Sequence, residues 1–310
     1  MKTFAKYSFF VLLFAACQSS DKKMVQNAPM ITQSYRDDMG REVGLPAKIE
    51  RVVSLAPSIT EMIYAIGGQD KLVARSQACD FPAETAQKEI VTTYPNVDLE
   101  ALKAKNPEVV LLTDEIFGSE LIPNIEKLGL KVYLQGFLHT QDIPRCMRNL
   151  GKILDCEKKA NQVADSLENL EKNIVKLTEN QAKYRTLMLV SDNPLIAIGG
   201  KGFLHEMIQK AGGKNIFENK KEAYPVVTIE EILDMQPEYL ILPTKNDQLY
   251  AQIMTQYPML QHTVANAQKQ VFMLDPDFLF RPGPRTMEGL MQLTNTLHST
   301  LTKEKLLNSK

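Results

Sequence analysis

The sequence contains no tryptophan, only four cysteines and four histidines, and no excess of charge of either sign. A net charge of −1 at pH 7 and a pI near 6.5 argue against the basic surface that nucleic acid binding requires. Without tryptophan, aromatic contacts to a ligand have to come from tyrosine and phenylalanine. The 310 residues, of which 44% are hydrophobic and 24% charged, indicate a globular protein of about two domains.

Motifs of common enzyme classes are also missing. The chain has no GxxxxGK[ST] phosphate loop, no GxSxG nucleophile turn and no HExxH zinc motif. Its histidines are isolated, and it has neither a CxxC nor a Cys/His cluster that would hold a structural zinc ion. We therefore expect no catalytic residue, no metal ligand and no resident cofactor.

The N-terminus differs from the rest of the chain. Lys2 and Lys6 precede the apolar run 9–16, which ends at Cys17. This run is shorter than the about 20 apolar residues that span a bilayer, and it is typical of a secretion signal. Small residues before a cysteine and polar residues after it resemble the lipobox of bacterial lipoproteins, although Phe14 stands where leucine is more common. The resemblance implies a signal peptide at 1–17, lipidation of Cys17 and a flexible tether at 18–30; a plain signal peptide is the alternative.

Three cysteines remain after Cys17, so they cannot all pair with one another. Cys146 and Cys156 are ten residues apart in helical sequence, about 15 Å along a straight helix, which is beyond the reach of a disulfide. A bridge from Cys79 to either of them stays open.

From residue 50 onward, short β-rich runs alternate with amphipathic helices, interrupted by a purely helical stretch. Alternation of this kind predicts an α/β fold with parallel sheets covered on both faces. The central stretch predicts a short helix, a break at Asp155 and a helix of more than 20 residues. We expect an N-terminal lobe at 31–141, connecting helices at 142–183, a C-terminal lobe at 184–302 and a tail at 303–310.

An internal repeat supports two related lobes. Residues 98–112 (DLEALKAKNPEVVLL) align without gaps on residues 228–242 (TIEEILDMQPEYLIL), an offset of 130. Each copy predicts a helix cap, a glutamate two positions later, a helix, a Pro-Glu turn and a buried strand. Two such lobes facing each other would form a cleft, where ligands usually bind.

The repeated glutamates are Glu100 and Glu230. An acidic residue in a first helical turn complements the helix dipole, an effect of about 0.3–1 kcal/mol. One carboxylate on each lobe would also form a two-point dock for arginines of a membrane partner. Both interpretations are open from the residues alone.

The segment 275–285 (DPDFLFRPGPR) combines aromatic residues, an acid and Arg281 in a proline-rich loop after a predicted strand. Loops at the carboxyl ends of strands bind ligands in α/β folds. We expect Asp277, Phe278 and Arg281 to contact a ligand. The alternative is a structural loop in which Asp277 and Arg281 pair with each other.

The chain is similar to the cobalamin and iron-siderophore class of periplasmic binding proteins of ABC importers. Four segments carry the resemblance: 38–43 (DMGREV), 48–61 (KIERVVSLAPSITE), 79–82 (CDFP) and 211–217 (AGGKNIF). It covers about residues 31–300 and implies two Rossmann-like lobes joined by a long rigid helix, with small hinge motions on ligand binding. It also implies a protein outside the cytoplasmic membrane, periplasmic or at the cell surface.

Corrinoid binders are the nearest likeness within this class. The resemblance places their docking glutamates at Glu100 and Glu230, their pocket aromatics at Tyr94 and Tyr224, and a pocket Asp and Arg at Asp277 and Arg281. Ala78 and Thr113 depart from the pattern, because aromatic residues are expected there.

The resemblance therefore implies a monomer that captures a corrinoid such as cobalamin and delivers it to an ABC permease dimer. Haem or a ferric siderophore is the alternative, and haem would need an axial ligand such as Tyr94, Tyr224 or His139. Two other classes are a metal-cluster enzyme on a two-lobed scaffold, for which the cysteines lack cluster-like spacing, and a surface adhesin or sensor without a permease.

Overall fold

The computed structural model describes residues 32–114 and 121–301, which belong to one compact unit. The predicted signal peptide with Cys17, the tether at 18–30 and the tail at 303–310 lie outside the described residues. No helix within the described part of the chain is long and apolar enough to cross a membrane.

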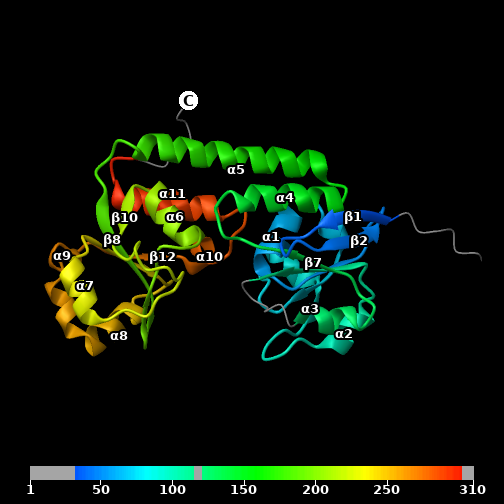
Figure 1. Ribbon diagram of the computed structural model, residues 1–310, viewed down its shortest axis with the longest axis horizontal. Helices are drawn as coiled ribbons and strands as arrows, with labels where there is room; N and C mark the ends of the chain where they lie inside the picture. The colour runs from blue at the N-terminus through cyan, green and yellow to red at the C-terminus, as the bar shows by residue number, and fades with distance from the viewer. Residues whose placement is uncertain (1–31, 115–120, 302–310) are drawn as a thin grey trace, which may run out of the picture. The chain divides into compact units, whose positions relative to one another are not determined.

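The N-terminal lobe is built on a parallel five-stranded sheet in the order β5-β4-β3-β6-β7 (Figure 1). Its strands are β3 (Val52–Ser54), β4 (Leu72–Ser76), β5 (Glu89–Val91), β6 (Val109–Thr113) and β7 (Val132–Gln135). Every side chain of β6 is buried, as expected for a central strand with both faces covered. The chain turns from one side of β3 to the other between β5 and β6, so the switch point of the sheet lies between β3 and β6.

The C-terminal lobe has a second sheet in the order β10-β8-β11-β12, whose strands are parallel except for β9, which pairs antiparallel with β8. The strands are β8 (Tyr184–Asp192), β9 (Leu195–Ala197), β10 (Gly213–Asn215), β11 (Tyr239–Pro243) and β12 (Val271–Leu274). The predicted alternation is thus confirmed, and β5, β9 and β10 are additions that the sequence reasoning did not include.

Helices cover both faces of each sheet, which gives each lobe two apolar clusters. The N-terminal lobe has α1 (Pro57–Ala65), α2 (Leu99–Ala104), α3 (Leu121–Glu126) and the short turns η1 (Gln69–Lys71) and η2 (Ala83–Gln87). The C-terminal lobe has α6 (Phe203–Lys210), α7 (Ile229–Met235), α8 (Gln248–Gln256), η3 (Pro258–His262), α9 (Val264–Ala267), α10 (Pro276–Leu279) and α11 (Thr286–Leu297).

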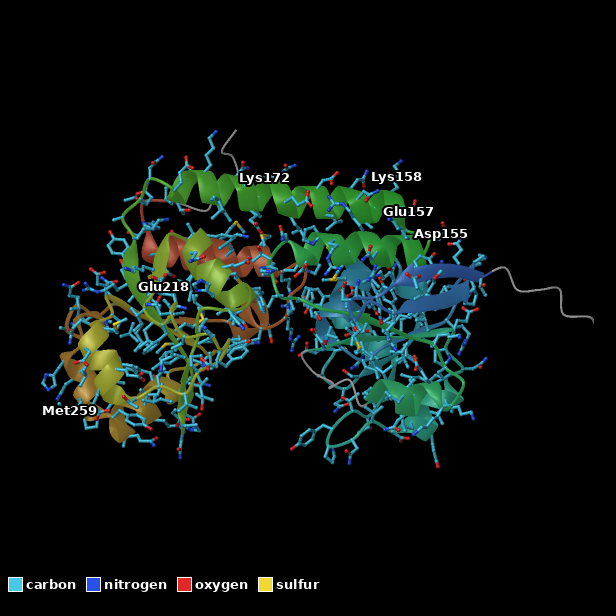
Figure 2. The ribbon with its side chains drawn as sticks, viewed as in Figure 1. Asp155, Glu157, Lys158, Lys172, Glu218 and Met259 are labelled. Carbon is cyan, nitrogen blue, oxygen red and sulfur yellow. The ribbon has the colours of Figure 1, made fainter. Side chains whose placement is uncertain are left out.

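Two helices connect the sheets, as predicted. α4 (Asp142–Ile153) and the 22-residue α5 (Glu157–Thr178) are separated at Asp155, whose backbone is left-handed with φ +56° (Figure 2). The first half of α5 packs its Ala160 on the N-terminal cluster, and the second half packs Ile174 on the C-terminal cluster. Leu167, between them, contacts both clusters. One straight helix is therefore part of both cores.

The hairpin β1 (Thr32–Arg36) and β2 (Glu42–Pro46) was not predicted. β1 is mostly polar and exposed, so it lacks the apolar alternation that identifies a strand. The turn that follows β1 ties the hairpin to the sheet, because the Asp38 carboxylate accepts hydrogen bonds from the Gly136 N–H (2.8 Å) and from Arg145 (2.6 Å).

The internal repeat is real at the level of single contacts. In each copy the glutamate of the Pro-Glu turn accepts a hydrogen bond from the backbone N–H at the start of the lobe's first strand. Glu108 binds the N–H of Arg51 (2.9 Å), and Glu238 binds that of Arg185 (2.8 Å). Two residues before each glutamate the backbone is left-handed, with φ of +47° and +45°. The repeat therefore fixes how each lobe's helix and first strand join.

Candidate functional site

Polar and aromatic residues gather at the carboxyl ends of the strands in both sheets. In the N-terminal lobe Asp80 follows β4, Tyr94 follows β5, and Phe137 follows β7. In the C-terminal lobe Lys245 follows β11 and Asp277 follows β12. This edge is where open α/β sheets bind ligands, so the fold places the predicted site at its expected position.

A pocket of about 220 Å³ joins the two lobes at this edge. Its lining includes Asp114, Phe137 and Leu138 from the N-terminal lobe and Lys201, Phe203 and Tyr224 from the C-terminal lobe. The volume lies below the roughly 300–1,000 Å³ of small-molecule pockets. A large ligand would therefore extend beyond it, over surface such as the exposed Val226.

Two glycines position the loop that carries Tyr224. The N–H groups of Gly199 and Gly200 donate to the carbonyl oxygens of Ala223 (2.9 Å) and Lys220 (2.8 Å). A Cβ at Gly199 would lie 2.1 Å from the Glu222 carbonyl oxygen, so a larger residue would push this loop away. The Gly-rich run after β9 is thus a close-packed turn that holds Tyr224 at the pocket.

Tyr94 does not line that pocket, and its side chain is 81% exposed. It belongs nonetheless to the repeat, because the Tyr94-Pro95 pair recurs 130 residues later as Tyr224-Pro225. This extension of the repeat is visible in the sequence and was missed by the sequence reasoning. Each lobe presents one tyrosine six residues before its repeated glutamate.

Arg281 is at the centre of an ion network that crosses between the lobes. Its guanidinium binds Asp80 (2.5 Å) and lies 3.6 Å from Glu61, both in the N-terminal lobe, and 3.1 Å from Asp277 on its own lobe. The hydrogen bond from Arg281 lowers the pKa of Asp80, which keeps this carboxylate ionised at neutral pH. The pairing of Asp277 with Arg281, which was the alternative to ligand contact, is present, and two carboxylates of the other lobe are added to it.

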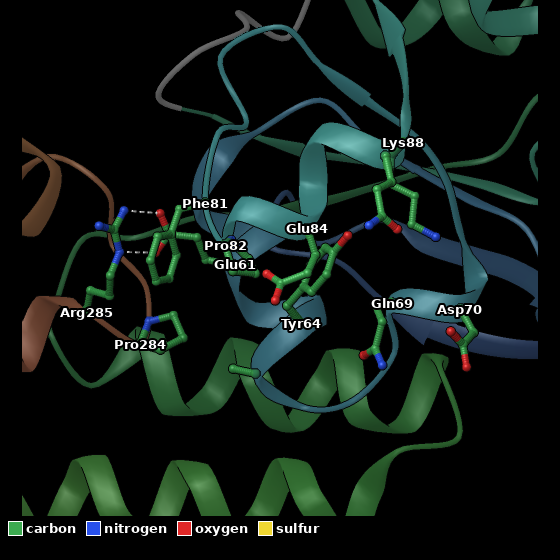
Figure 3. A pocket seen from close by; sticks show the side chains of 12 residues that line it. Glu61, Tyr64, Gln69, Asp70, Phe81, Pro82, Glu84, Lys88, Pro284 and Arg285 are labelled. Carbon is green, nitrogen blue, oxygen red and sulfur yellow. Dashed lines mark hydrogen bonds and ion pairs between the residues drawn. The ribbon is translucent and has the colours of Figure 1, made fainter.

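Glu61 and Arg285 make the second contact of this network (Figure 3). The Arg285 guanidinium binds both carboxylate oxygens of Glu61, at 2.9 and 2.5 Å, and stacks 4.0 Å from the centre of the Phe81 ring. The Glu61 side chain is only 2% exposed. Sequence reasoning missed Glu61 and Arg285, because their partners are 224 residues away along the chain and no spacing rule connects them.

A cavity of about 580 Å³ opens beside this contact. Its walls come from α1, η1, η2 and the 284–285 turn, and they include Tyr64, Asp70, Glu84 and Lys88 (Figure 3). None of the predicted ligand-binding residues lines it. It is therefore separate from the pocket at Tyr224.

The expected loop at 275–285 needs a correction. Asp277 and Phe278 lie on the short helix α10, because Asp275 caps it by accepting a hydrogen bond from the Asp277 N–H (2.9 Å). The Asp277 carboxylate also binds Lys245 (2.6 Å), and the Phe278 ring lies 5.3 Å from the Arg285 guanidinium. A Pro after a capping Asp was the sequence signal for this helix turn.

Glu100 and Glu230 are exposed on the second residues of α2 and α7. Each of these helices lies on the side of its own lobe away from α5 (Figure 1). Asp98 caps α2, and Thr228 caps α7 in a capping box completed by Glu231. Neither Glu100 nor Glu230 therefore takes part in capping its helix. Neither side chain bonds to any other residue that the structure describes.

His139, one of the candidates for an axial haem ligand, pairs through Nδ1 with Glu206 of α6. Glu206 also accepts a hydrogen bond from the Thr140 N–H (3.1 Å). The three cysteines in the described ranges, Cys79, Cys146 and Cys156, are free, which answers the open question of a disulfide. These ranges hold no group of three or more His, Cys, Asp or Glu that could bind a metal ion.

Residues 52–278 match the periplasmic binding protein family. The chain belongs to this family. It is 30% identical to the vitamin B12-binding protein of Vibrio parahaemolyticus over 264 residues, which are 82% of this chain and 92% of the relative. The relative from Vibrio vulnificus with the same name is 29% identical over 80% of this chain and 89% of its own.

Solved structures of this family share the fold. The vitamin B12 binding protein BtuF of Vibrio cholerae superposes with a TM-score of 0.71 at 24% identity, over 83% of this chain and 100% of its own. The haem-binding protein RhuT of Roseiflexus sp. RS-1 gives 0.73 at 21% identity, over 82% of this chain and 100% of its own. The predicted class of two α/β lobes joined by a long helix is confirmed. Membership also confirms an extracytoplasmic binding protein rather than an enzyme.

Proposed function

We propose that the protein captures a corrinoid between its lobes and delivers it to an ABC permease. The B12-binding relatives cover most of the chain and support this ligand class. Tyr94 and Tyr224 would contact the faces of the ring, Phe278 would add apolar contact, and Asp277 with Arg281 would bind its carboxamide groups. The exposed Glu100 and Glu230 would dock on the two permease subunits.

The charge of the ion network is the observation that carries this choice of ligand. Four carboxylates and three cations lie in it, so its net charge is negative. The carboxylates are Glu61, Asp80, Asp275 and Asp277, and the cations are Lys245, Arg281 and Arg285. Haem and ferric siderophores commonly carry negative charge and would meet this surface unfavourably, whereas the carboxamides of a corrinoid are neutral.

Titration of the purified protein with cyanocobalamin by calorimetry tests the proposal. We expect saturable binding of one corrinoid per chain, with a negative heat capacity change because apolar surface is buried. The absence of heat at tens of micromolar of both components would refute the ligand assignment. Haemin titrated in parallel gives the comparison, since a shift of its Soret band with tight binding would favour the haem alternative instead.

Haem is the second candidate because haem-binding proteins have the same fold. The hydroxyl of the exposed Tyr94 could reach an axial position, whereas His139 is engaged by Glu206. Tyr94→Phe should abolish a haem spectrum if this candidate is correct. The same substitution should change cyanocobalamin affinity only slightly, since the ring face is retained.

The membrane anchor is a separate proposal that rests on Cys17. Lipidation there would hold a monomeric binding protein at a membrane surface through the 18–30 tether. Cys17→Ser should release the protein into the soluble extracytoplasmic fraction, and metabolic labelling with a fatty acid should mark only the wild-type chain. Unlabelled wild type would leave a plain signal peptide as the correct interpretation.

A further inference from the structure

Arg281, the cation that the proposed function assigns to the ligand, is paired with carboxylates of both lobes. One of its terminal nitrogens binds Asp80 (2.5 Å), and the other binds Asp277 (3.1 Å) and lies 3.4 Å from the second Asp80 oxygen. Glu61 lies 3.6 Å away. A ligand group that accepts a hydrogen bond from these terminal nitrogens on the side of the carboxylates therefore has to replace one of them.

The three carboxylates differ in how easily they can be replaced. Glu61 is 2% exposed and is held by Nε and one terminal nitrogen of Arg285, so moving it would leave a buried charge unpaired. Asp277 is 21% exposed and is shared with Lys245 on the same lobe. Asp80 is 63% exposed, and among the residues that the structure describes its side chain binds only Arg281. Asp80 is the carboxylate that a ligand would displace.

Asp80 also belongs to the opposite lobe. It follows β4 of the N-terminal lobe, whereas Arg281 follows α10 of the C-terminal lobe. Its carboxylate accepts a hydrogen bond from Arg281, as an acceptor group of a ligand at this guanidinium would. After displacement it would remain near that group, because its loop is anchored by the buried Cys79 and by the contact of Phe81 with Arg285. A neutral acceptor would tolerate this neighbour, and an anionic acceptor would be repelled.

We propose that Asp80 is a specificity-determining residue that pairs with Arg281 and selects ligands whose side groups are neutral carboxamides over ligands with carboxylates. This inference rests on the proposed function, because it assumes that a corrinoid occupies the site at Arg281. It adds a residue from the N-terminal lobe to that site and gives it a selective role. The low pKa of Asp80 means that the selection operates throughout the neutral range.

A matched ligand pair measures this selection directly. Cyanocobalamin and a monocarboxylic derivative, in which one side-chain carboxamide of the corrin is hydrolysed, have nearly the same shape and differ by one negative charge. We expect the wild type to prefer the neutral ligand. Asp80→Asn should reduce this preference by about tenfold at low salt, mostly by tighter binding of the anionic ligand, and by less at high salt. The derivatives that carry the acid at different corrin positions should be measured separately, because only groups near Arg281 should respond.

Asp70→Asn is the matched control. Asp70 is an exposed carboxylate of the same lobe, and it makes no contact with Arg281 in the described structure. Its substitution should leave the preference unchanged, which separates a local contact from a general change in charge. Asp80→Ala provides a second variant, and thermal melts of all variants show whether they are folded.

The outcomes separate this inference from the proposed function. A wild type that binds neither corrinoid refutes both. If the wild type binds cyanocobalamin, and Asp80→Asn, Asp80→Ala and Asp70→Asn all keep its preference for the neutral ligand, the role of Asp80 is refuted. The proposed function then stands. A loss of preference confined to the Asp80 variants supports the role.

Discussion

The two lobes use the same sequence motif 130 residues apart, yet they contribute opposite charges to the ion network at Arg281 and Arg285. Each lobe offers one tyrosine at its strand ends and one exposed glutamate at a helix start. The contact between them is asymmetric, because the N-terminal lobe supplies Glu61 and Asp80, and the C-terminal lobe supplies Arg281 and Arg285.

The contrast between the repeated motif and the asymmetric ion network shows how two related lobes can share one ligand site. The tyrosines and glutamates hold equivalent positions in the repeat, which under the proposed function would suit two similar permease subunits and two faces of a flat ligand. The residues that join the lobes come from outside the repeat and cannot be equivalent, because two like charges would repel each other. Under the proposed function the repeated residues would contact the partners, whereas the unique residues hold the two lobes together through ion pairs.

Truncation of the matched core residues should give the largest effect. Leu102 in α2 and Ile232 in α7 occupy equivalent positions of the repeat, and both are fully buried. Leu102→Ala and Ile232→Ala should each lower the free energy of unfolding by about 2–5 kcal/mol, from lost burial and a residual cavity. Urea denaturation measures this. If one of the two substitutions lowered the free energy of unfolding by less than about 1 kcal/mol, the two copies of the repeat would not contribute equally to stability.

Neutralising the repeated glutamates should give an intermediate effect on delivery and none on ligand affinity. Glu100→Gln and Glu230→Gln should each slow transport into vesicles that contain the partner permease by about tenfold, and the double variant should be slower still. Glu179→Gln, at the exposed end of α5, is the control and should transport normally. Full transport by the double variant would contradict the docking role.

Removal of the helix caps should cost about 1 kcal/mol in each lobe and should differ between them. Asp98 accepts one hydrogen bond from the Ala101 N–H, whereas Thr228 and Glu231 form a reciprocal capping box. The double variant Thr228→Ala/Glu231→Ala should therefore destabilise the protein more than Asp98→Ala, since it removes two capping hydrogen bonds instead of one. The reverse order in thermal melts would show that the charge of Asp98 matters more than the number of bonds.

The smallest effect concerns the fall of the melting temperature at mildly acidic pH, to which His298 of the C-terminal lobe should contribute. Burial lowers the pKa of His298 below 6.5, so the neutral imidazole is favoured in the folded state. Its contribution to stability is complete above pH 6.5 and is lost as the pH falls from there through the folded pKa. His298→Asn should flatten the decline of melting temperature between pH 7 and pH 5. His262→Asn, at an exposed histidine, is the control and should leave this decline unchanged. If His298→Asn also left it unchanged, other groups would be responsible for the decline.

Most of the fold could be predicted because its signals are local. Alternating apolar runs located the parallel strands, the caps Asp98 and Thr228 located two helix starts, and Asp155 located the break before the long helix. The hairpin at 32–46 was missed since β1 is polar, and α10 was missed since a four-residue helix has no periodicity.

The site was predictable only in part, for a related reason. Asp277 and Arg281 are four residues apart, so their pairing could be anticipated from the sequence. Glu61 and Asp80 reach the same guanidinium groups from more than 200 residues away, and only the relative placement of the sheets brings them there. The roles of Tyr94, Tyr224 and the docking glutamates remain predictions from the resemblance.

The long helix α5 has a consequence for attempts to divide this protein. Because its first half belongs to the N-terminal core and its second half to the C-terminal core, no cut in the chain yields two halves that each keep a complete apolar interior. A protease that nicked α5 near Leu167 would expose apolar surface on both fragments at once, and each fragment expressed alone should aggregate. Circular permutants that open the chain at a surface turn and leave α5 intact should instead remain soluble.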